Sequence, residues 1–453
     1  MTRIPSHSRF FAKTHNISRR AFIAFGSPVL CLLAIGSGGI GYLAHYLNHI
    51  DKYPGEQIKK LAGEAMNTLF KLFPGLYGKI PWLPIGIFPT PVEEFRAPIG
   101  MYEGRLFVKR DDLSSPLYGG NKVRKLEHLL AEAALGNNKT IVTIGGIGSN
   151  HALATALHSQ AMGFNVELSL FEQPVTSYVM DNLLGFLAAG AKLQYGDNIL
   201  EGFRNARKAF KTRKNNNEAP YFIISGGTCR LGNIGYVTAA LELAEQIRNG
   251  LIPEPDRIFV PVGTCGTAAG LIAGLKIAGL RTKVMGVRVL DSFPANSFMI
   301  RYYAQNVANY LHKNDPLVPE VSIKENDFEL LTDYIGNGYG FPTLAGKRAI
   351  KWATPRLKLE TTYSGKALAA CLDYCITKGK RQTILFWNTY NSSHFPKADS
   401  LDGIPEQLFP IFSKKLISQT DLLQLTGIPP SEHLDFTENN FRKVKNVVPK
   451  YDI

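Results

Sequence analysis

A lysine that stands directly behind two glycines is the residue of this chain with the clearest potential for chemistry. It is Lys122, in the run Gly119-Gly120-Asn121-Lys122, and it opens a helix predicted over residues 122–135. Glycines let a backbone approach a ligand closely, and loss of solvent there lowers the pKa of an amine toward catalytic use. The pattern indicates a nucleophilic or basic lysine, although a solvated lysine at a helix start has the same local sequence.

A second glycine-rich turn follows a predicted strand that ends at Ile144. Residues 145–151 read Gly-Gly-Ile-Gly-Ser-Asn-His and lead into a predicted helix. Backbone N–H groups at a helix start, together with the side chains of Ser149 and Asn150, are donors suited to a carboxylate or a phenolic oxygen. Capping of the helix is the alternative role for Ser149.

A third turn has the form of a phosphate cradle. The run Gly263-Thr264-Cys265-Gly266-Thr267 separates a predicted strand from a predicted helix. Its small residues let successive N–H groups converge, the helix dipole favours an anion, and the two threonine hydroxyls add donors. No Gly-Lys-Ser/Thr closes the turn, so it is not a nucleoside-triphosphate loop, and it does not match a dinucleotide fingerprint.

The elements that must position these turns alternate between short strands and helices. Such alternation predicts an α/β fold with open parallel sheets and right-handed crossovers. Ligands of such sheets bind at the carboxyl ends of the strands, where the glycine-rich turns fall. Strands are predicted at 106–109, 140–144, 166–171, 192–195, 221–224, 258–262, 283–289 and 383–387, and helices at 122–135, 151–162, 178–189, 235–248 and 267–278.

Five motifs in one order make the chain resemble the fold-type II pyridoxal-phosphate enzymes, specifically the family of D-cysteine desulfhydrase and 1-aminocyclopropane-1-carboxylate deaminase. The resemblance covers residues 85–410 and implies a two-lobed, tryptophan synthase beta-like fold with a smaller lobe, residues 125–228, inserted in the larger one. It also implies pyridoxal 5′-phosphate as cofactor, a small amino acid as substrate and a homodimer. The motifs are Lys-Arg-Asp-Asp (109–112) followed by Gly-Gly-Asn-Lys-Val-Arg-Lys-Leu-Glu (119–127), Gly-Gly-Ile-Gly-Ser-Asn-His (145–151), Leu-Gly-Asn-Ile-Gly-Tyr (231–236), Gly-Tyr-Gly-Phe-Pro (338–342) and Tyr-Ser-Gly-Lys-Ala (363–367).

The resemblance assigns roles to the residues that match these motifs. It implies that Lys122 holds the cofactor as a Schiff base and later moves the Cα proton of the substrate, and that Asn150 bonds the 3′-oxygen of the cofactor. It implies that Ser149 binds the substrate carboxylate, with Tyr339 and Tyr363 facing the substrate side chain. The cofactor phosphate is expected on the turn formed by Gly263, Thr264, Cys265, Gly266 and Thr267.

Ser364 bears on which reaction the site performs. The resemblance implies that this position faces the pyridine nitrogen, where the deaminase branch has a glutamate that keeps the nitrogen protonated for opening of a cyclopropane ring. A serine leaves the nitrogen neutral, which suffices for β-elimination of a good leaving group such as thiolate. We therefore expect a lyase that converts D-cysteine to sulfide, pyruvate and ammonia. Cyclopropane deaminase-like chemistry and another amino-acid lyase or racemase are the alternatives.

Two departures from the family pattern concern the substrate end of this site. The family usually has a glutamine, which helps to bind the substrate carboxylate, at the position of Gly148. After the strand predicted at 383–387, the family's His/Thr-Gly-Gly turn is replaced by residues 388–391, in which Tyr390 adds bulk to the pocket wall. These changes leave open a hypothesis of another class, a membrane-anchored pyridoxal-phosphate-binding protein without turnover.

The amino terminus predicts a membrane anchor. Residues 21–50 contain no Asp, Glu, Lys or Arg and are long enough to span a bilayer, and they lack the shorter apolar stretch and small-x-small site of a cleaved signal peptide. Five basic residues precede the run, so the positive-inside rule predicts a single-pass protein with a cytoplasmic N-terminus and a catalytic region outside, in the periplasm. A twin-arginine signal at Arg19-Arg20, a mitochondrial presequence and a buried hairpin are the alternatives.

These expectations divide the chain into four regions. They are a basic terminus and anchor (1–50), a linker with an amphipathic helix (51–87), the catalytic region (88–412) and a tail (413–453). The 453 residues carry a formal net charge of +14, but the basic residues are scattered and show no signature of nucleic-acid binding. The five cysteines form no CxxC pair and no Cys/His metal spacing, so neither a metal site nor a disulfide framework is predicted.

Overall fold

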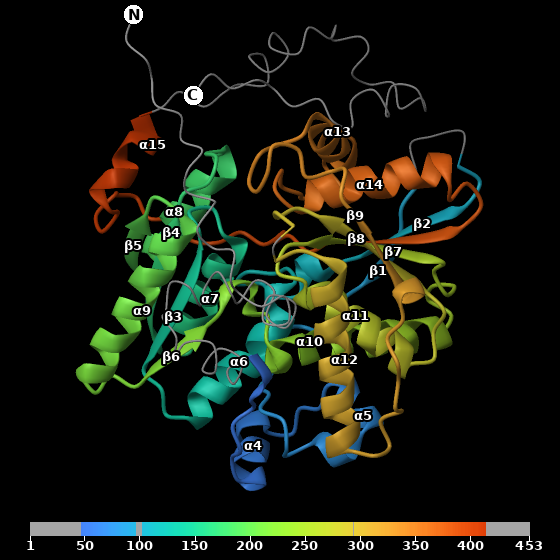
Figure 1. Ribbon diagram of the computed structural model, residues 1–453, viewed down its shortest axis with the longest axis horizontal. Helices are drawn as coiled ribbons and strands as arrows, with labels where there is room; N and C mark the ends of the chain where they lie inside the picture. The colour runs from blue at the N-terminus through green and yellow to red at the C-terminus, as the bar shows by residue number, and fades with distance from the viewer. Residues whose placement is uncertain (1–46, 97–101, 293, 414–453) are drawn as a thin grey trace, which may run out of the picture.

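Two β-sheets organise the chain. A computed structural model describes residues 47–96, 102–292 and 294–413, and it has one sheet in each of two lobes, at the left and right of Figure 1. The four-stranded sheet has the order β5 (Lys192–Gly196), β4 (Asn165–Phe171), β3 (Thr140–Gly146) and β6 (Pro220–Ile223). The six-stranded sheet has the order β1 (Val92–Glu94), β2 (Arg105–Lys109), β10 (Thr383–Trp387), β7 (Arg257–Val262), β8 (Lys283–Arg288) and β9 (Phe328–Leu331).

The strands pair in parallel except at one edge. Only β1 runs antiparallel to its neighbour β2 among the paired strands of the described residues. The central strands β3, β7 and β10 are apolar along nearly their whole length and are buried on both faces, as expected for parallel strands covered by helices. The predicted α/β architecture with open parallel sheets is therefore confirmed.

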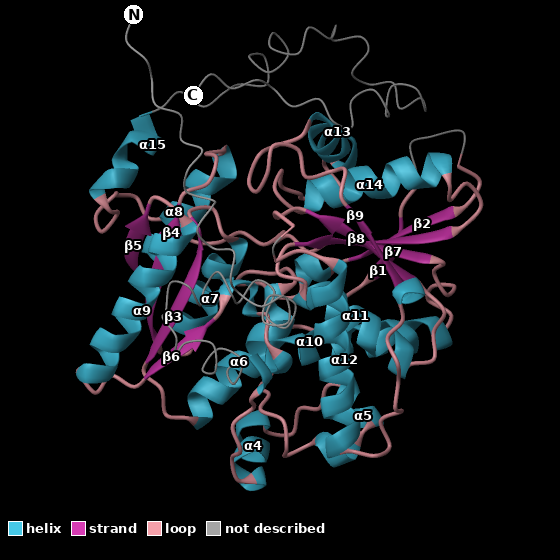
Figure 2. Cartoon of the chain, in the orientation of Figure 1, coloured by secondary structure: helices cyan, strands magenta, loops and turns pink. Residues whose placement is uncertain are grey.

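Helices cover both faces of each sheet, as the cyan ribbons of Figure 2 show. In the smaller lobe α9 (Ile199–Asn215) lies on one face, and α7 (Asn150–Ala161) and α8 (Ser177–Ala188) lie on the other. In the larger lobe α10 (Arg230–Arg248), α11 (Gly266–Ile277) and α12 (Ser297–Asn314) form one layer, and α13 (Leu344–Ala353) and α14 (Ser364–Thr377) form the opposite one. The other α-helices that lie wholly within the described residues are α4 (Gly55–Ala62), α5 (Thr68–Leu72), α6 (Lys122–Leu135) and α15 (Phe409–Ser413).

Helix α6 joins the lobes and carries the candidate lysine at its first position. It begins and ends at the predicted residues, Lys122 and Leu135, and nearly every side chain along it is buried. The turn before it needs a glycine at position 120. Gly120 has φ +95°, and a Cβ there would lie 2.7 Å from the carbonyl oxygen of Thr389, so both the backbone conformation and the close approach exclude a side chain.

A buried cluster of four charges fixes the start of α6. Arg124 bonds Asp111 at 2.8 Å and Glu242 at 2.9 Å, and Glu242 lies 2.5 Å from the amine of Lys109. Trp387 donates a further hydrogen bond of 2.8 Å to Asp111. Burial by itself raises the pKa of Asp111, but the charge of Arg124 outweighs it and lowers this pKa to about 2. The two cations and two carboxylates balance, so β2, β10, α6 and α10 are tied together without net buried charge.

The fold class requires one correction. In the described part of the chain, no helix is long and apolar enough to cross a membrane. The transmembrane helix, the single-pass localisation with a periplasmic catalytic region, and the membrane as a partner are therefore not supported. The prediction relied on the absence of charge in residues 21–50, which is necessary for a span but does not by itself make a helix. Residues 21–46 of that run, and the tail from residue 414, lie outside the described residues.

Truncation of one carboxylate in the charge cluster should destabilise the fold strongly. Glu242→Ala leaves Lys109 and Arg124 buried without a counter-charge, so we expect the free energy of unfolding to fall by about 3–5 kcal/mol in urea titration. Glu245→Ala, at an exposed position three residues further along α10, is the matched control and should change it by less than about 0.5 kcal/mol. Equal losses in the two variants would contradict a structural role for the cluster.

Candidate active site

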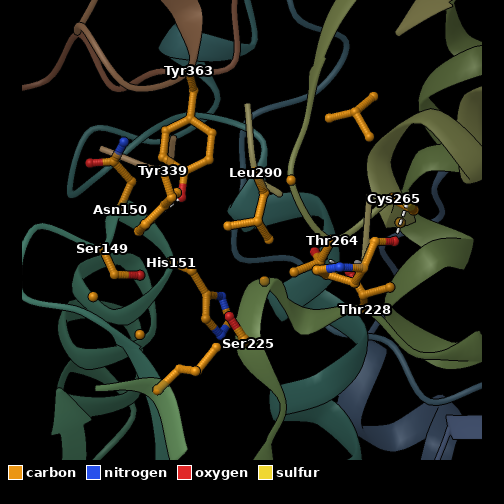
Figure 3. Close-up of a pocket in the computed structure, with 18 of the residues that line it drawn as sticks. Ser149, Asn150, His151, Ser225, Thr228, Thr264, Cys265, Leu290, Tyr339 and Tyr363 are labelled. Carbon is orange, nitrogen blue, oxygen red and sulfur yellow. Dashed lines mark hydrogen bonds between the residues drawn. The ribbon is translucent and has the colours of Figure 1, made fainter. Parts of the chain in front are cut away.

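A cavity of about 640 Å³ lies between the two lobes. It sits at the carboxyl ends of β3, β4, β7 and β8, where residues at or just after the end of each strand line it. Ten of the eleven candidate residues line it together: Lys122, Ser149, Asn150, Gly263, Thr264, Cys265, Gly266, Thr267, Tyr339 and Tyr363. Figure 3 shows Ser149, Asn150, Tyr339 and Tyr363 at one end of this cavity, with Thr228, Thr264 and Cys265 at the other. Ser364 does not line it.

Lys122 is held in the cavity wall by the turn that precedes it. The backbone N–H of Asn121 donates to the carbonyl oxygen of Thr389 (3.1 Å), and the amide side chain of Asn121 donates to Thr267 (3.0 Å). Desolvation lowers the pKa of the Lys122 amine to about 8, although the nearby carboxylate of Glu360 raises it. An amine with such a pKa is partly neutral near physiological pH, so it is available as a nucleophile or base.

The third turn forms an anion site at the start of α11. Its backbone turns through Cys265, which has φ +69°, while the thiol points away toward the carbonyl oxygen of Pro294. Cys265 therefore contributes backbone rather than sulfur. The hydroxyls of Thr264 and Thr228 are 2.6 Å apart at the mouth of the turn, and the helix dipole favours an anion there.

A second buried lysine reaches this anion site, and the sequence analysis missed it. The amine of Lys125 donates to the carbonyl oxygen of Gly226 (2.9 Å) and to Thr228 (3.3 Å). A Cβ built on Gly266 would lie 2.7 Å from this amine, so only glycine leaves room for it. Burial, reinforced by the charge of Lys122, holds the pKa of Lys125 well below its ordinary value. The spacing of Lys122 and Lys125, three residues apart on one helical face, was the available signal.

These groups fit a phosphate. Lys125, the two threonine hydroxyls and the first N–H groups of α11 are all donors, and an anion would restore the charge of the buried lysine. Asn233 is fully buried beside Gly266, and neither atom of its amide has a hydrogen-bond partner among the described residues. A buried amide without partners costs free energy, and a phosphate oxygen that accepted from its NH₂ group would recover part of that cost.

At the opposite end, Asn150 is oriented by two residues that the sequence analysis did not single out. Its side-chain oxygen accepts hydrogen bonds from Asn182 on α8 (3.1 Å) and from the hydroxyl of Tyr118 (3.3 Å). With the oxygen occupied, the NH₂ group of Asn150 is left to donate toward the cavity. Ser149 accepts from the backbone N–H of Ala152 (3.2 Å), so it caps α7 and still has a hydroxyl proton to donate.

Tyrosines line the wall beside Ser149 and Asn150. The hydroxyls of Tyr339 and Tyr363 are hydrogen-bonded at 2.8 Å, and Tyr390 lines the same wall with 7% of its surface exposed. Burial raises the pKa of Tyr339 to about 12 and the pKa of Tyr363 well above its ordinary value. Both hydroxyls are therefore protonated at neutral pH, and because one of them donates to the other, the pair has one proton left to donate to a ligand.

Glu360 is the carboxylate that sequence reasoning missed. It lines the cavity, is 3% exposed, and accepts hydrogen bonds from the backbone N–H groups of Thr362 (2.6 Å), Tyr363 (2.8 Å) and Ser364 (2.8 Å). Ser364 is fully buried behind it, with its hydroxyl 3.3 Å from the Glu360 carboxylate. Burial raises the pKa of Glu360, and the three N–H groups oppose that rise. The structure thus brings a carboxylate, rather than the serine hydroxyl, to the cavity surface.

Comparisons with known proteins agree with this geometry. Residues 83–389 match the family model described as "Pyridoxal-phosphate dependent enzyme". The chain is 29% identical over 320 residues, 69% of its length and 93% of the relative's, to a putative 1-aminocyclopropane-1-carboxylate deaminase of Pyrococcus furiosus. It is 31% identical over 303 residues, 65% of its length and 88% of the relative's, to a D-cysteine desulfhydrase of Klebsiella pneumoniae. A solved structure of an ACC deaminase homologue superposes with a TM-score of 0.61 and 27% identity, and covers 73% of this chain and 96% of that one.

The pKa of Lys122 sets an expected pH dependence. Capture of pyridoxal phosphate by cofactor-free protein requires the neutral amine, so its rate should rise with pH and reach half its maximum near pH 8. Glu360→Gln removes the carboxylate that raises this pKa, so the midpoint should move to lower pH. Glu406→Gln, at an exposed position, is the control. Stopped-flow absorbance measures the rate, and an unshifted midpoint in Glu360→Gln would show that the carboxylate does not act on Lys122.

Proposed function

Because the chain belongs to the pyridoxal-phosphate dependent enzyme family, we propose that its cavity catalyses β-elimination from a small amino acid, with D-cysteine as the substrate and sulfide, pyruvate and ammonia as the products. The observation that carries this proposal is the position of Lys122, a desolvated amine between an anion site and a wall of neutral donors. The family acts on small amino acids, and the identity of this amino acid is the proposed part.

The residues present can hold the cofactor at three points. Lys122 would bind its aldehyde carbon, and Asn150 would donate to its phenolic oxygen. The phosphate would lie against the first residues of α11, with Thr264 and Thr267 as donors from the cavity wall. The amine of Lys125, which is bonded to Gly226 and lies beside Gly266, would be a further, charged donor. When bound, the cofactor withdraws electrons from the Cα of the substrate.

The chain's own residues would then perform the proton transfers. Ser149 and the N-terminal end of α7 would hold the substrate carboxylate. The Lys122 amine would take the proton from Cα, and the electron pair of that bond would expel the thiolate from Cβ. The hydroxyls of Tyr339 and Tyr363 lie 2.8 Å apart, and the one that does not donate to the other would be the neutral donor for the departing sulfur. Water would hydrolyse the released aminoacrylate to pyruvate and ammonia.

A cyclopropane deaminase is the second candidate, and Glu360 is the observation that favours it. The serine at position 364 supports elimination, since it is a neutral group where the deaminase branch has an acid. However, the carboxylate of Glu360 lies 3.3 Å from the Ser364 hydroxyl and lines the cavity. A carboxylate so close to the position expected to face the pyridine nitrogen would stabilise the protonated ring that opening of a cyclopropane needs.

We also infer a homodimer from the family resemblance. Multi-angle light scattering of the full chain tests this inference, and a mass of one chain at micromolar concentration would contradict it.

Lys122→Ala should abolish both the cofactor's visible-edge absorption band and turnover, because the variant lacks the amine that binds and exchanges the cofactor. Wild-type protein should release sulfide and pyruvate in equal amounts from D-cysteine, measured beside L-cysteine and 1-aminocyclopropane-1-carboxylate. Release of ammonia from the cyclopropane alone would favour the deaminase. A loaded protein that is inert to a panel of amino acids would favour a binding protein without turnover.

Lys125→Met should weaken cofactor binding while leaving the Schiff-base lysine in place. Loss of one charge-assisted hydrogen bond costs about 1.5–3 kcal/mol, which corresponds to a rise of about 10- to 100-fold in the Kd for pyridoxal phosphate. Lys139→Met, at an exposed position beyond the end of α6, is the matched control. An unchanged Kd in Lys125→Met, measured by absorbance titration of cofactor-free protein, would remove Lys125 from the phosphate site.

A further inference from the structure

Gln173 lies buried behind the amino-acid end of the cavity, and no part of the proposed mechanism uses it. It follows β4 on the smaller lobe, and 4% of its surface is exposed. Its side chain fills the space between the second glycine-rich turn and the loop that carries Tyr339. Ser149 belongs to that turn, so Gln173 contacts the segments that carry both walls of the amino-acid end.

The glycines around Gln173 show how completely it fills this space. A Cβ built on Gly146 would overlap the side-chain oxygen of Gln173 and lie 3.2 Å from the ring of Tyr339. A Cβ built on Gly148 would lie 2.7 Å from the side-chain nitrogen of Gln173. On the other lobe, a Cβ built on Gly340 would lie 3.4 Å from the Cβ of Gln173. Two backbone segments thus approach the glutamine: the second glycine-rich turn, where a side chain at Gly146 or Gly148 would collide with its amide, and the Tyr339 loop, which is in van der Waals contact with it.

The side-chain amide of Gln173 is also linked, through Tyr178 and Thr362, to the segment that carries Tyr363. Its NH₂ group donates to the hydroxyl of Tyr178 (3.3 Å), which is itself hydrogen-bonded to Thr362, the neighbour of Tyr363. Its oxygen has no hydrogen-bond partner among the described residues. A buried acceptor without a partner costs about 1–3 kcal/mol, and an apolar residue of similar size would avoid that cost. Packing alone therefore does not account for a glutamine here.

We propose that Gln173 is a positioning residue that sets the spacing between the Ser149 turn and the Tyr339–Tyr363 pair, and thereby the affinity for the amino-acid substrate. This inference rests on the proposed function. The contacts described for Gln173 all lie at the amino-acid end of the cavity, so we expect it to act on the amino acid and not on the cofactor. The absence of a side chain at Gly146 leaves the space that the Gln173 amide occupies.

The first test separates amino-acid affinity from cofactor affinity. The full-length protein loaded with pyridoxal phosphate is titrated with D-alanine, which has no leaving group on Cβ, and the absorbance change is followed. Gln173→Ala should raise the apparent Kd for D-alanine by about tenfold, with the Kd for pyridoxal phosphate within twofold of wild type. Gln160→Ala, at an exposed position on α7, should change neither constant. An unchanged Kd for D-alanine in Gln173→Ala would overturn the proposal.

A double-mutant cycle between positions 146 and 173 tests the pairing without any need for turnover. Gly146→Ala forces its methyl group onto the amide and should lower Tm by about 2 °C or more. In the Gln173→Ala background the same substitution should lower Tm by less than half as much, since the colliding atoms are gone. Additive effects on Tm would overturn the pairing.

The two tests distinguish failure of this inference from failure of the proposed function. In one outcome, no amino acid changes the absorbance of the wild-type protein, but the Tm changes of Gly146→Ala and Gln173→Ala are not additive. The proposed function then fails, and the role of Gln173 in substrate binding fails with it. If wild type responds to D-alanine and Gln173→Ala responds with the same Kd, the proposed function stands and only the role of Gln173 is overturned.

Discussion

The rest of the site depends on the buried contact between Arg124 and its two carboxylates, Asp111 and Glu242. Arg124 lies two residues after Lys122, so holding its guanidinium at 2.8 and 2.9 Å from these carboxylates fixes the rotation and the start of α6. Asp111 follows β2 and Glu242 lies on α10, so the contact also sets the position of α6 relative to the larger sheet. A buried arginine without both partners would carry an uncompensated charge in the core, which couples placement of the reactive lysine to global stability.

The first turn of α6 carries two lysines whose amines lie at two different parts of the site. Lys122 enters the middle of the cavity, and Lys125 reaches the anion site at the start of α11. Desolvation lowers the pKa of both amines, and the charge of Lys122 lowers the pKa of Lys125 further. Glu360, which the N-terminal backbone of α14 holds in place, provides the counter-charge that raises the pKa of Lys122. The charge state of Lys122 is thus a balance between burial and one neighbouring carboxylate.

The amino-acid end of the cavity differs from the anion site because its hydrogen-bond donors are neutral groups. Its donors are the hydroxyls of Ser149, Tyr339 and Tyr363 and the amide of Asn150, and none carries a charge at neutral pH. Selectivity there depends on the spacing of neutral groups, because each hydrogen bond is short-ranged and sensitive to geometry. Asn182 and Tyr118 orient Asn150, and Gln173 lies between the segments that carry Ser149 and Tyr339. Residues outside the cavity lining therefore help to fix the geometry of the donors at this end.

The sequence by itself determined the features that depend only on residues close together in the chain, namely the strands, helices and turns. Strand and helix alternation gave the parallel sheets, and the three glycine-rich turns and Lys122 were located because turn geometry and helix starts are local. Helices α9, α12, α13 and α14 went unpredicted, although apolar residues recur at helical spacing in α9, at Ile199, Phe203, Ala206 and Phe210. Only the tertiary structure brought Glu360 to the cavity and Lys125 to the turn before α11, turned the Ser364 hydroxyl to Glu360, and placed Gln173 against Gly146. Those outcomes depend on contacts between separate elements, which no local pattern encodes.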